Sequence, residues 1–86
     1  MALNKKIEYY LQKTFAPEAL IDEQLLGKDI TFKTNEYGEA VTLFIGKRRP
    51  DGAITGERYV RTIVRKPNSN EILKSHWDLK GKVERA

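Results

Sequence analysis

The first regular pattern of apolar positions lies at the N-terminus of the chain. Apolar side chains recur at i, i+4, i+7 and i+8, which are Leu3, Ile7, Tyr10 and Leu11. This spacing places them on one face of an α-helix. Asn4 is a residue type that caps helix N-termini. The pattern therefore predicts a short amphipathic helix at the start of the chain.

A second helix is predicted directly afterwards. Pro17 suits the first turn of a helix, where its missing N–H is not needed. Leu20, Ile21 and Leu25 form an apolar stripe, and Gly27 fits a left-handed C-terminal cap. Both helices are short, so packing must stabilise them. Together they would make residues 1–27 the helical part of the chain.

From Lys28 onward the apolar period changes to two, which is typical of half-buried β-strands. Ile30 and Phe32, for example, alternate with polar residues. Residue types that favour turns interrupt this alternation at 35–38, 49–52 and 67–70. Four strands are predicted between these turns, at 28–34, 41–48, 58–66 and 71–78.

Strands joined by such short turns pair antiparallel with their neighbours. The predicted fold is α+β: two N-terminal helices pack on one face of a four-stranded antiparallel meander, in the order ααββββ. Eighty-six residues suffice for one hydrophobic core, so residues 1–86 are expected to form a single domain. The sheet would occupy 28–80, and 81–86 would be a tail or a short fifth strand.

Alternation also predicts which strand residues face the helices. The inward set is predicted to be Ile30, Phe32, Val41, Leu43, Ile45, Val60, Val64, Leu73, Trp77 and Leu79. The third strand is ambiguous, because its other apolar pair, Tyr59 and Ile63, would serve the core nearly as well. A slip of one residue would invert that strand's contribution.

The positive charge of the chain is unevenly distributed. The net charge is +4, yet residues 1–27 hold three lysines against four acidic side chains. Residues 47–66 hold seven basic and two acidic side chains. If the alternation is right, many of these cations lie on the sheet face that the helices leave open, with aromatic rings among them.

A basic face with interleaved rings is what single-stranded nucleic acid requires, since cations neutralise phosphates and rings stack on bases. The predicted function is thus a non-enzymatic binding module that uses this face, with nucleic acid as one partner. The candidate binding residues are Lys33, Phe44, Arg48, Arg49, Tyr59, Arg61, Arg65, Lys74 and His76.

Two alternatives explain the same face differently. Long charged side chains on exposed strands also prevent aggregation, so the face could be solvated and without a partner. Alternatively, Phe44, Ile63 and Ile72 would make an apolar patch that a second copy or another protein buries. A homodimer or a protein-interaction domain is therefore the competing hypothesis.

Candidate chemistry is sparse. His76 and Asp78 share a strand face beside Lys74, and a histidine beside a carboxylate can act as an acid or base. Small basic α+β domains also occur among bacterial ribonuclease toxins, and that likeness of size and charge makes RNA cleavage the most remote alternative. No catalytic residue is assigned.

The remaining composition predicts no cofactor and no metal site, because the chain has no cysteine and one histidine. No signal peptide or segment of about 20 apolar residues is recognisable. We therefore expect a cytoplasmic, bacterial protein with no membrane partner.

Overall fold

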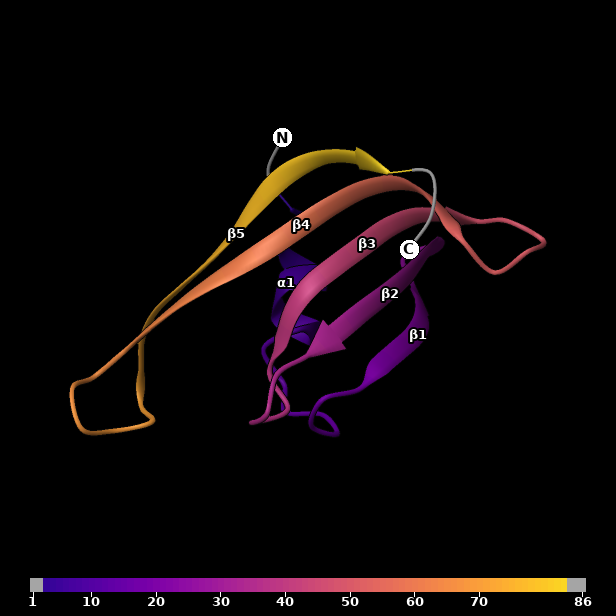
Figure 1. Cartoon of the computed structure of the whole chain (residues 1–86). Coiled ribbons are helices and arrows are strands. Elements are labelled where there is room, and N and C mark those ends of the chain that lie inside the picture. The colour runs from indigo at the N-terminus through magenta and orange to yellow at the C-terminus, as the bar shows by residue number, and fades with distance from the viewer. Residues whose placement is uncertain (1–2, 84–86) are drawn as a thin grey trace.

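The computed structural model describes residues 3–83, which form one short helix and a five-stranded antiparallel sheet (Figure 1). The strands follow one another as a meander, in the order β1-β2-β3-β4-β5. The elements are α1 (Lys5–Tyr10), β1 (Leu20–Leu25), β2 (Lys28–Thr34), β3 (Ala40–Arg48), β4 (Ile54–Arg65) and β5 (Ile72–Val83).

The predicted fold of two helices on a four-stranded meander is wrong, because the predicted second helix is strand β1. Ile21 and Leu25 are four residues apart, and that spacing places two side chains on one face of a helix or of a strand alike. A two-residue turn, Leu26-Gly27, joins β1 to β2, with φ values of 52° and 76°. Two consecutive positive φ angles are the geometry of a tight β-hairpin, so Gly27 serves a hairpin and not a helix cap.

Thr34 holds the start of β1 beside the end of β2. Its Oγ1 donates to the carbonyl of Ala16 at 2.7 Å and accepts from the backbone N–H of Ala19 at 2.8 Å. Its own N–H donates to the carbonyl of Ala19 at 2.9 Å. These bonds use backbone groups that a helix beginning at Pro17 would need, so the segment enters the sheet instead.

The first predicted helix is confirmed as α1. The Oδ1 of Asn4 accepts the Lys6 backbone N–H at 2.8 Å, which caps the helix as expected. Ile7 and Leu11 are buried against one face of the sheet, called here the helix face. The core on this face consists of Leu3, Ile7, Leu11, Ile30, Phe32, Ala40, Leu43, Ile45, Tyr59 and Trp77.

The predicted facing of the third strand is wrong. Tyr59 lies opposite Leu43 in the β3–β4 pair, and directly opposite residues share a face, so Tyr59 points toward α1. Alternation then places Arg61 on the helix face and Val60 and Val64 on the opposite, open face. The number of apolar residues on each face of β4 favours the opposite arrangement, because the residues that point inward include Arg61.

Arg61 is tolerated inside because two nitrogens of its guanidinium form hydrogen bonds and the group lies over an aromatic ring. Its Nε donates to the Ser75 Oγ at 2.6 Å, and its Nη1 donates to the Ala40 carbonyl at 3.2 Å. The guanidinium lies over the Trp77 ring, 5.9 Å from the centroid. Burial lowers the pKa of Arg61, and the nearby Glu39 carboxylate acts in the opposite direction.

The predicted last strand is longer than expected. Gly81 does not end it: with φ of +124° it lies opposite Arg58, next to a register shift, and β5 continues to Val83. An extra residue in one strand of a pair lets the ladder bend and resume. The rest of the predicted tail, 84–86, lies outside the described residues.

Candidate functional site

Strands β4 and β5 extend beyond the rest of the sheet. The β3–β4 pairing ends at Thr42 and Val60, whereas β4 and β5 stay paired as far as Arg65 and Ile72. Residues 62–76, here called the arm, therefore form a two-stranded ribbon that projects from the body (Figure 1).

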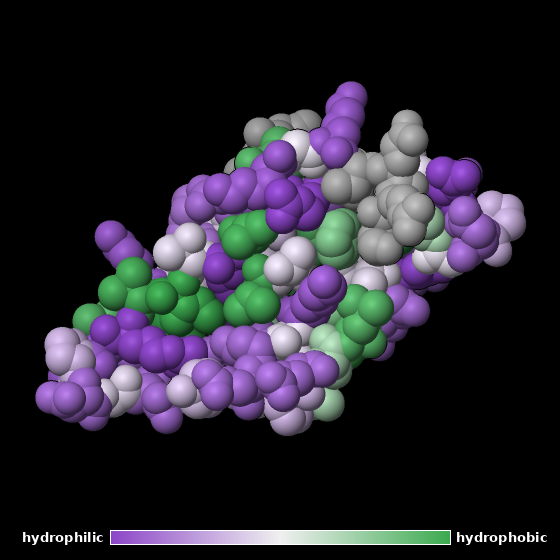
Figure 2. All heavy atoms as spheres, in the orientation of Figure 1, coloured by the Kyte–Doolittle hydropathy of each residue, from purple (hydrophilic) through white to green (hydrophobic). Residues whose placement is uncertain are grey.

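The arm exposes apolar side chains near its end. Leu73 is 60% exposed, and Val64 and Ile72 are also exposed. Figure 2 shows an apolar patch beside the polar turn at the end of the arm. A two-stranded ribbon is marginally stable in water and gains from a partner that covers such residues.

One arginine braces the arm against the β2–β3 turn. Arg65 forms a short ion pair with the Glu39 carboxylate and lies over the Tyr37 ring, 4.8 Å from its centroid. It also donates to the Asn70 carbonyl at 2.9 Å. The hydrogen bond from Arg65 holds the pKa of Glu39 below the usual 4.5, and a second bond from Asn35 acts in the same direction.

This brace predicts a specific acid sensitivity. Because the pKa of Glu39 is lowered in the folded state, the Glu39 carboxylate stabilises the fold at a pH above its unfolded-state pKa. This contribution is lost as the pH falls through the folded-state pKa. We expect Glu39→Gln to be less stable than the parent at about pH 7, and the difference to shrink toward about pH 3. Urea denaturation across this range measures it. A difference that is constant with pH would contradict the role given to the carboxylate.

The outer edge of β5 is the second part of the site. β5 ends the sheet order, so β4 is its one neighbouring strand within residues 3–83. Register shifts against β4 leave Leu73 and Lys80 as extra residues on β5. Between them, 74–79 is a regular stretch whose edge backbone groups can pair with a further strand.

Polar side chains recur at every second position along this regular stretch. Lys74, His76 and Asp78 lie on the open face, opposite Val64, Thr62 and Val60 of β4. The Nε2 of His76 lies 2.8 Å from the Oδ1 of Asp78; the His76 side chain is largely exposed and that of Asp78 is half-buried. The two residues share one face, as predicted, and their side chains bend far enough to meet.

The structure separates the candidate nucleic-acid residues. Those on the open face are Lys33, Phe44, Arg48, Lys74 and His76. Phe44 is buried there, so its ring offers little stacking surface. Tyr59 and Arg61 are buried on the helix face, Arg49 lies at the β3–β4 turn, and Arg65 contacts Glu39.

The arginines of the set have partners inside the fold. Arg48 lies 3.5 Å from the Asp22 carboxylate and donates to the Thr31 Oγ1 at 2.8 Å. Arg49 lies 3.8 Å from the Asp51 carboxylate. A phosphate would have to compete with these contacts, so the exposed lysines are the better cations for a polyanion. Nucleic-acid binding itself stays a prediction.

Residue-by-residue alternation missed the edge of β5 as a site. Its signal was the mirror arrangement of Lys74 and Asp78, two residues before and two after His76. This symmetry matters only if the strand lies at the edge of the sheet. Alternation predicts which face of the sheet a residue is on and says nothing about the edge.

Comparisons with known proteins give no assignment: no family model, no curated protein and no solved structure matches the chain. Within residues 3–83 no group of three or more histidine, cysteine or acidic side chains is arranged to hold a metal ion. In the same part of the chain, no helix is long and apolar enough to cross a membrane.

Proposed function

We propose that this chain is a non-enzymatic self-association module, which forms a twofold homodimer by pairing the outer edges of two β5 strands. The observation that carries the proposal is the pattern of charge and apolar side chains along that edge, which is complementary to itself. The dimer would be the functional form of the protein. We place it in the cytoplasm, because a chain without cysteine suits that reducing compartment.

Symmetry restricts how two β5 strands can pair. Two antiparallel edge strands related by a twofold axis form one continuous sheet, and opposite residues then share a face. Centring the pair on His76 places Lys74 opposite Asp78 of the partner subunit, twice. The same register brings Leu73, the extra residue at the end of the regular stretch, close to Leu79 of the partner subunit.

Neighbouring registers are less favourable. Centring on Trp77 would place Lys74 opposite Lys80 of the partner subunit, and like charges directly opposite are destabilising. Centring on Asp78 would place its carboxylate opposite Asp78 of the partner subunit. The His76-centred register instead pairs opposite charges and lies within the regular stretch 74–79. It also buries Leu73, which is 60% exposed in the single chain.

Charge reversal and mixing test this register. We expect Lys74→Glu and Asp78→Lys each to weaken self-association by roughly tenfold or more, because each creates two like-charge pairs. An equimolar mixture of the two variants should dimerise again, since in a mixed dimer every pair across the edge joins a carboxylate to a lysine. Sedimentation equilibrium of each variant and of the mixture measures this.

The matched control is Lys33→Glu, an exposed lysine on the open face of β2 and away from the edge. It should dimerise like the parent protein. The proposal is overturned if the parent is a monomer at about 1 mM, or if the mixture associates no better than the single variants.

The same set of variants also tests whether the open face binds nucleic acid. Labelled single-stranded DNA and RNA are titrated at two salt concentrations. Binding that falls steeply with salt and weakens in Lys33→Glu, but not in Asp78→Lys, would support the open face as a nucleic-acid surface. Binding without dimerisation would replace the self-association proposal.

A further inference from the structure

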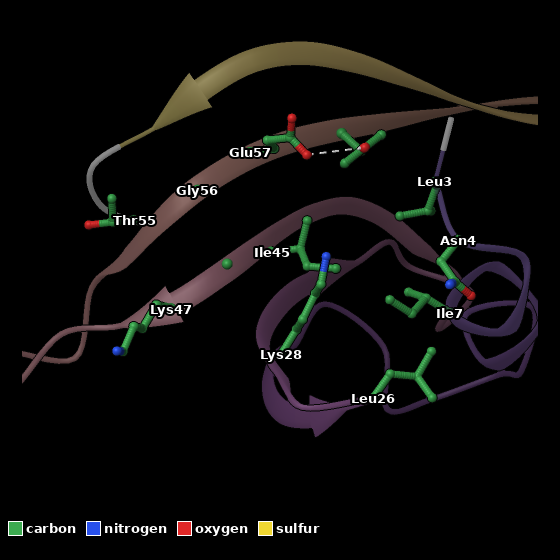
Figure 3. A pocket seen from close by; sticks show the side chains of 12 residues that line it. Leu3, Asn4, Ile7, Leu26, Lys28, Ile45, Lys47, Thr55, Gly56 and Glu57 are labelled. Carbon is green, nitrogen blue, oxygen red and sulfur yellow. Dashed lines mark hydrogen bonds between the residues drawn. The ribbon is translucent and has the colours of Figure 1, made fainter. Parts of the chain in front are cut away.

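The helix face of the sheet carries a cavity away from the arm. It has a volume of about 700 Å³ and lies between the first turn of α1, the β1–β2 turn and strands β3 and β4 (Figure 3). The cavity exists because α1 has six residues and covers part of the face. Its volume is within the range of small-molecule sites.

The inner wall of the cavity is apolar and well ordered by packing. Leu3 and Ile7 line it from the helix side, and Ile45 and Tyr59 line it from the sheet. All four are buried members of the core, at most 7% exposed, so a ligand would reach only small parts of them. A ligand with an apolar body would therefore contact a surface that is already formed, which lowers the cost of binding.

Leu26 at the mouth of the cavity has an unfavourable backbone conformation. Its φ is +52°, and it is the first central residue of the β1–β2 turn, where asparagine, aspartate or glycine is preferred. A left-handed leucine costs about 1–2 kcal/mol, and with 56% of its surface exposed it gains little from packing. Its side chain points toward the cavity beside Ile7 (Figure 3). An exposed, strained leucine at a cavity mouth is explained if it contacts a ligand.

The mouth of the cavity carries a positive charge at Lys28. Lys28 extends along the opening toward Ile45, whereas the side chain of Lys47, which also lines the cavity, points away from it (Figure 3). The one carboxylate among the lining residues is Glu57, which accepts a hydrogen bond of 3.4 Å from the Tyr59 hydroxyl. An anionic group at the mouth would meet the Lys28 ammonium, whereas a cationic group would be repelled.

We propose that this cavity binds a small molecule with an apolar body and one anionic group, such as a medium-chain or aromatic carboxylate. The apolar body lies between Leu26 and Ile45, and the carboxylate lies at Lys28. This site is on the helix face, so it is independent of the β5 edge and of the proposed dimer.

The probe is decanoate, used below its micelle concentration and followed by NMR shifts of backbone amides. We expect saturable shifts centred on the cavity residues, with decanol binding about tenfold more weakly and decyltrimethylammonium more weakly still. The proposal is overturned if decanoate causes no saturable shifts at these residues, or if the ammonium compound binds as tightly as the acid.

Two variants separate the ligand contacts from the fold. Lys28→Gln should weaken decanoate about tenfold and leave decanol unchanged. Leu26→Asn should weaken both, although asparagine suits the turn and should leave thermal stability equal or higher. The matched controls, Lys33→Gln and Leu20→Asn, are exposed residues that do not line the cavity. Equal losses in the controls would refute the site.

Discussion

Replacing Gly46 with alanine is expected to remove a large part of the protein's free energy of unfolding. Gly46 lies opposite Gly56 in the β3–β4 pair, and a methyl group on either would overlap a backbone carbonyl of the other strand. For Gly46 that carbonyl belongs to Thr55. The obstacle is the backbone of two interior strands, so relief requires breaking part of the ladder. We expect a loss of about 3–5 kcal/mol, against a total stability of about 5–10 kcal/mol.

Gly52→Ala is the matched control for this substitution. Gly52 lies in the next turn with φ of +92° and has open space where a Cβ would be. Alanine there meets only backbone strain, about 1–2 kcal/mol, and each kcal/mol corresponds to roughly 4–8 °C in melting temperature. Circular dichroism melts compare the three proteins. Equal losses for Gly46→Ala and Gly52→Ala would contradict the close approach of β3 and β4.

The glycine pair also shows where sequence interpretation reaches its limit. Gly46 and Gly56 are ten residues apart, and their meaning depends on the register that places them opposite each other. The sequence predicts the turn between them correctly, through Pro50 and Gly52. It does not predict how closely the two backbones approach.

Strands β2 and β3 were predictable because one of their two faces is clearly more apolar. Ile30 and Phe32 alternate with polar residues, Leu43 lies between Thr42 and Phe44, and all three are buried on the helix face as expected. β1 was not predictable in this way. Its apolar residues are spaced as a helix or a strand would have them, and the pairing with β2 decided between the two.

The candidate site was affected most by one ambiguous strand. Both faces of β4 carry apolar residues, so alternation alone could not choose between Tyr59 and Val60. The inward turn of Tyr59 removes an aromatic ring from the open face. Because the exposed apolar residues of the arm remain, the structure shifts the more promising surface from the centre of the sheet to the edge of β5.

Replacing Arg61 tests most sharply whether β4 turns Tyr59 and Arg61 toward the helix face. If Arg61 were an exposed cation in a nucleic-acid surface, Arg61→Ala would change the free energy of unfolding by no more than about 0.5 kcal/mol. In the structure it is 8% exposed, bonds Ser75 and the Ala40 carbonyl, and lies over Trp77. Arg61→Ala removes these bonds and leaves a void beside the Trp77 ring. We expect a loss of about 2–4 kcal/mol.

Arg49→Ala is the matched arginine control. Its ion pair with Asp51 is exposed, and exposed pairs contribute about 0–1 kcal/mol. Urea denaturation of both variants at low protein concentration measures the effect on the single chain. Since a buried arginine cannot also hold a phosphate, a strong loss in Arg61→Ala assigns this cation to the core. If Arg61→Ala is as stable as Arg49→Ala, Arg61 and Tyr59 do not point toward α1. Both would then lie on the open face and be candidates for binding a polyanion.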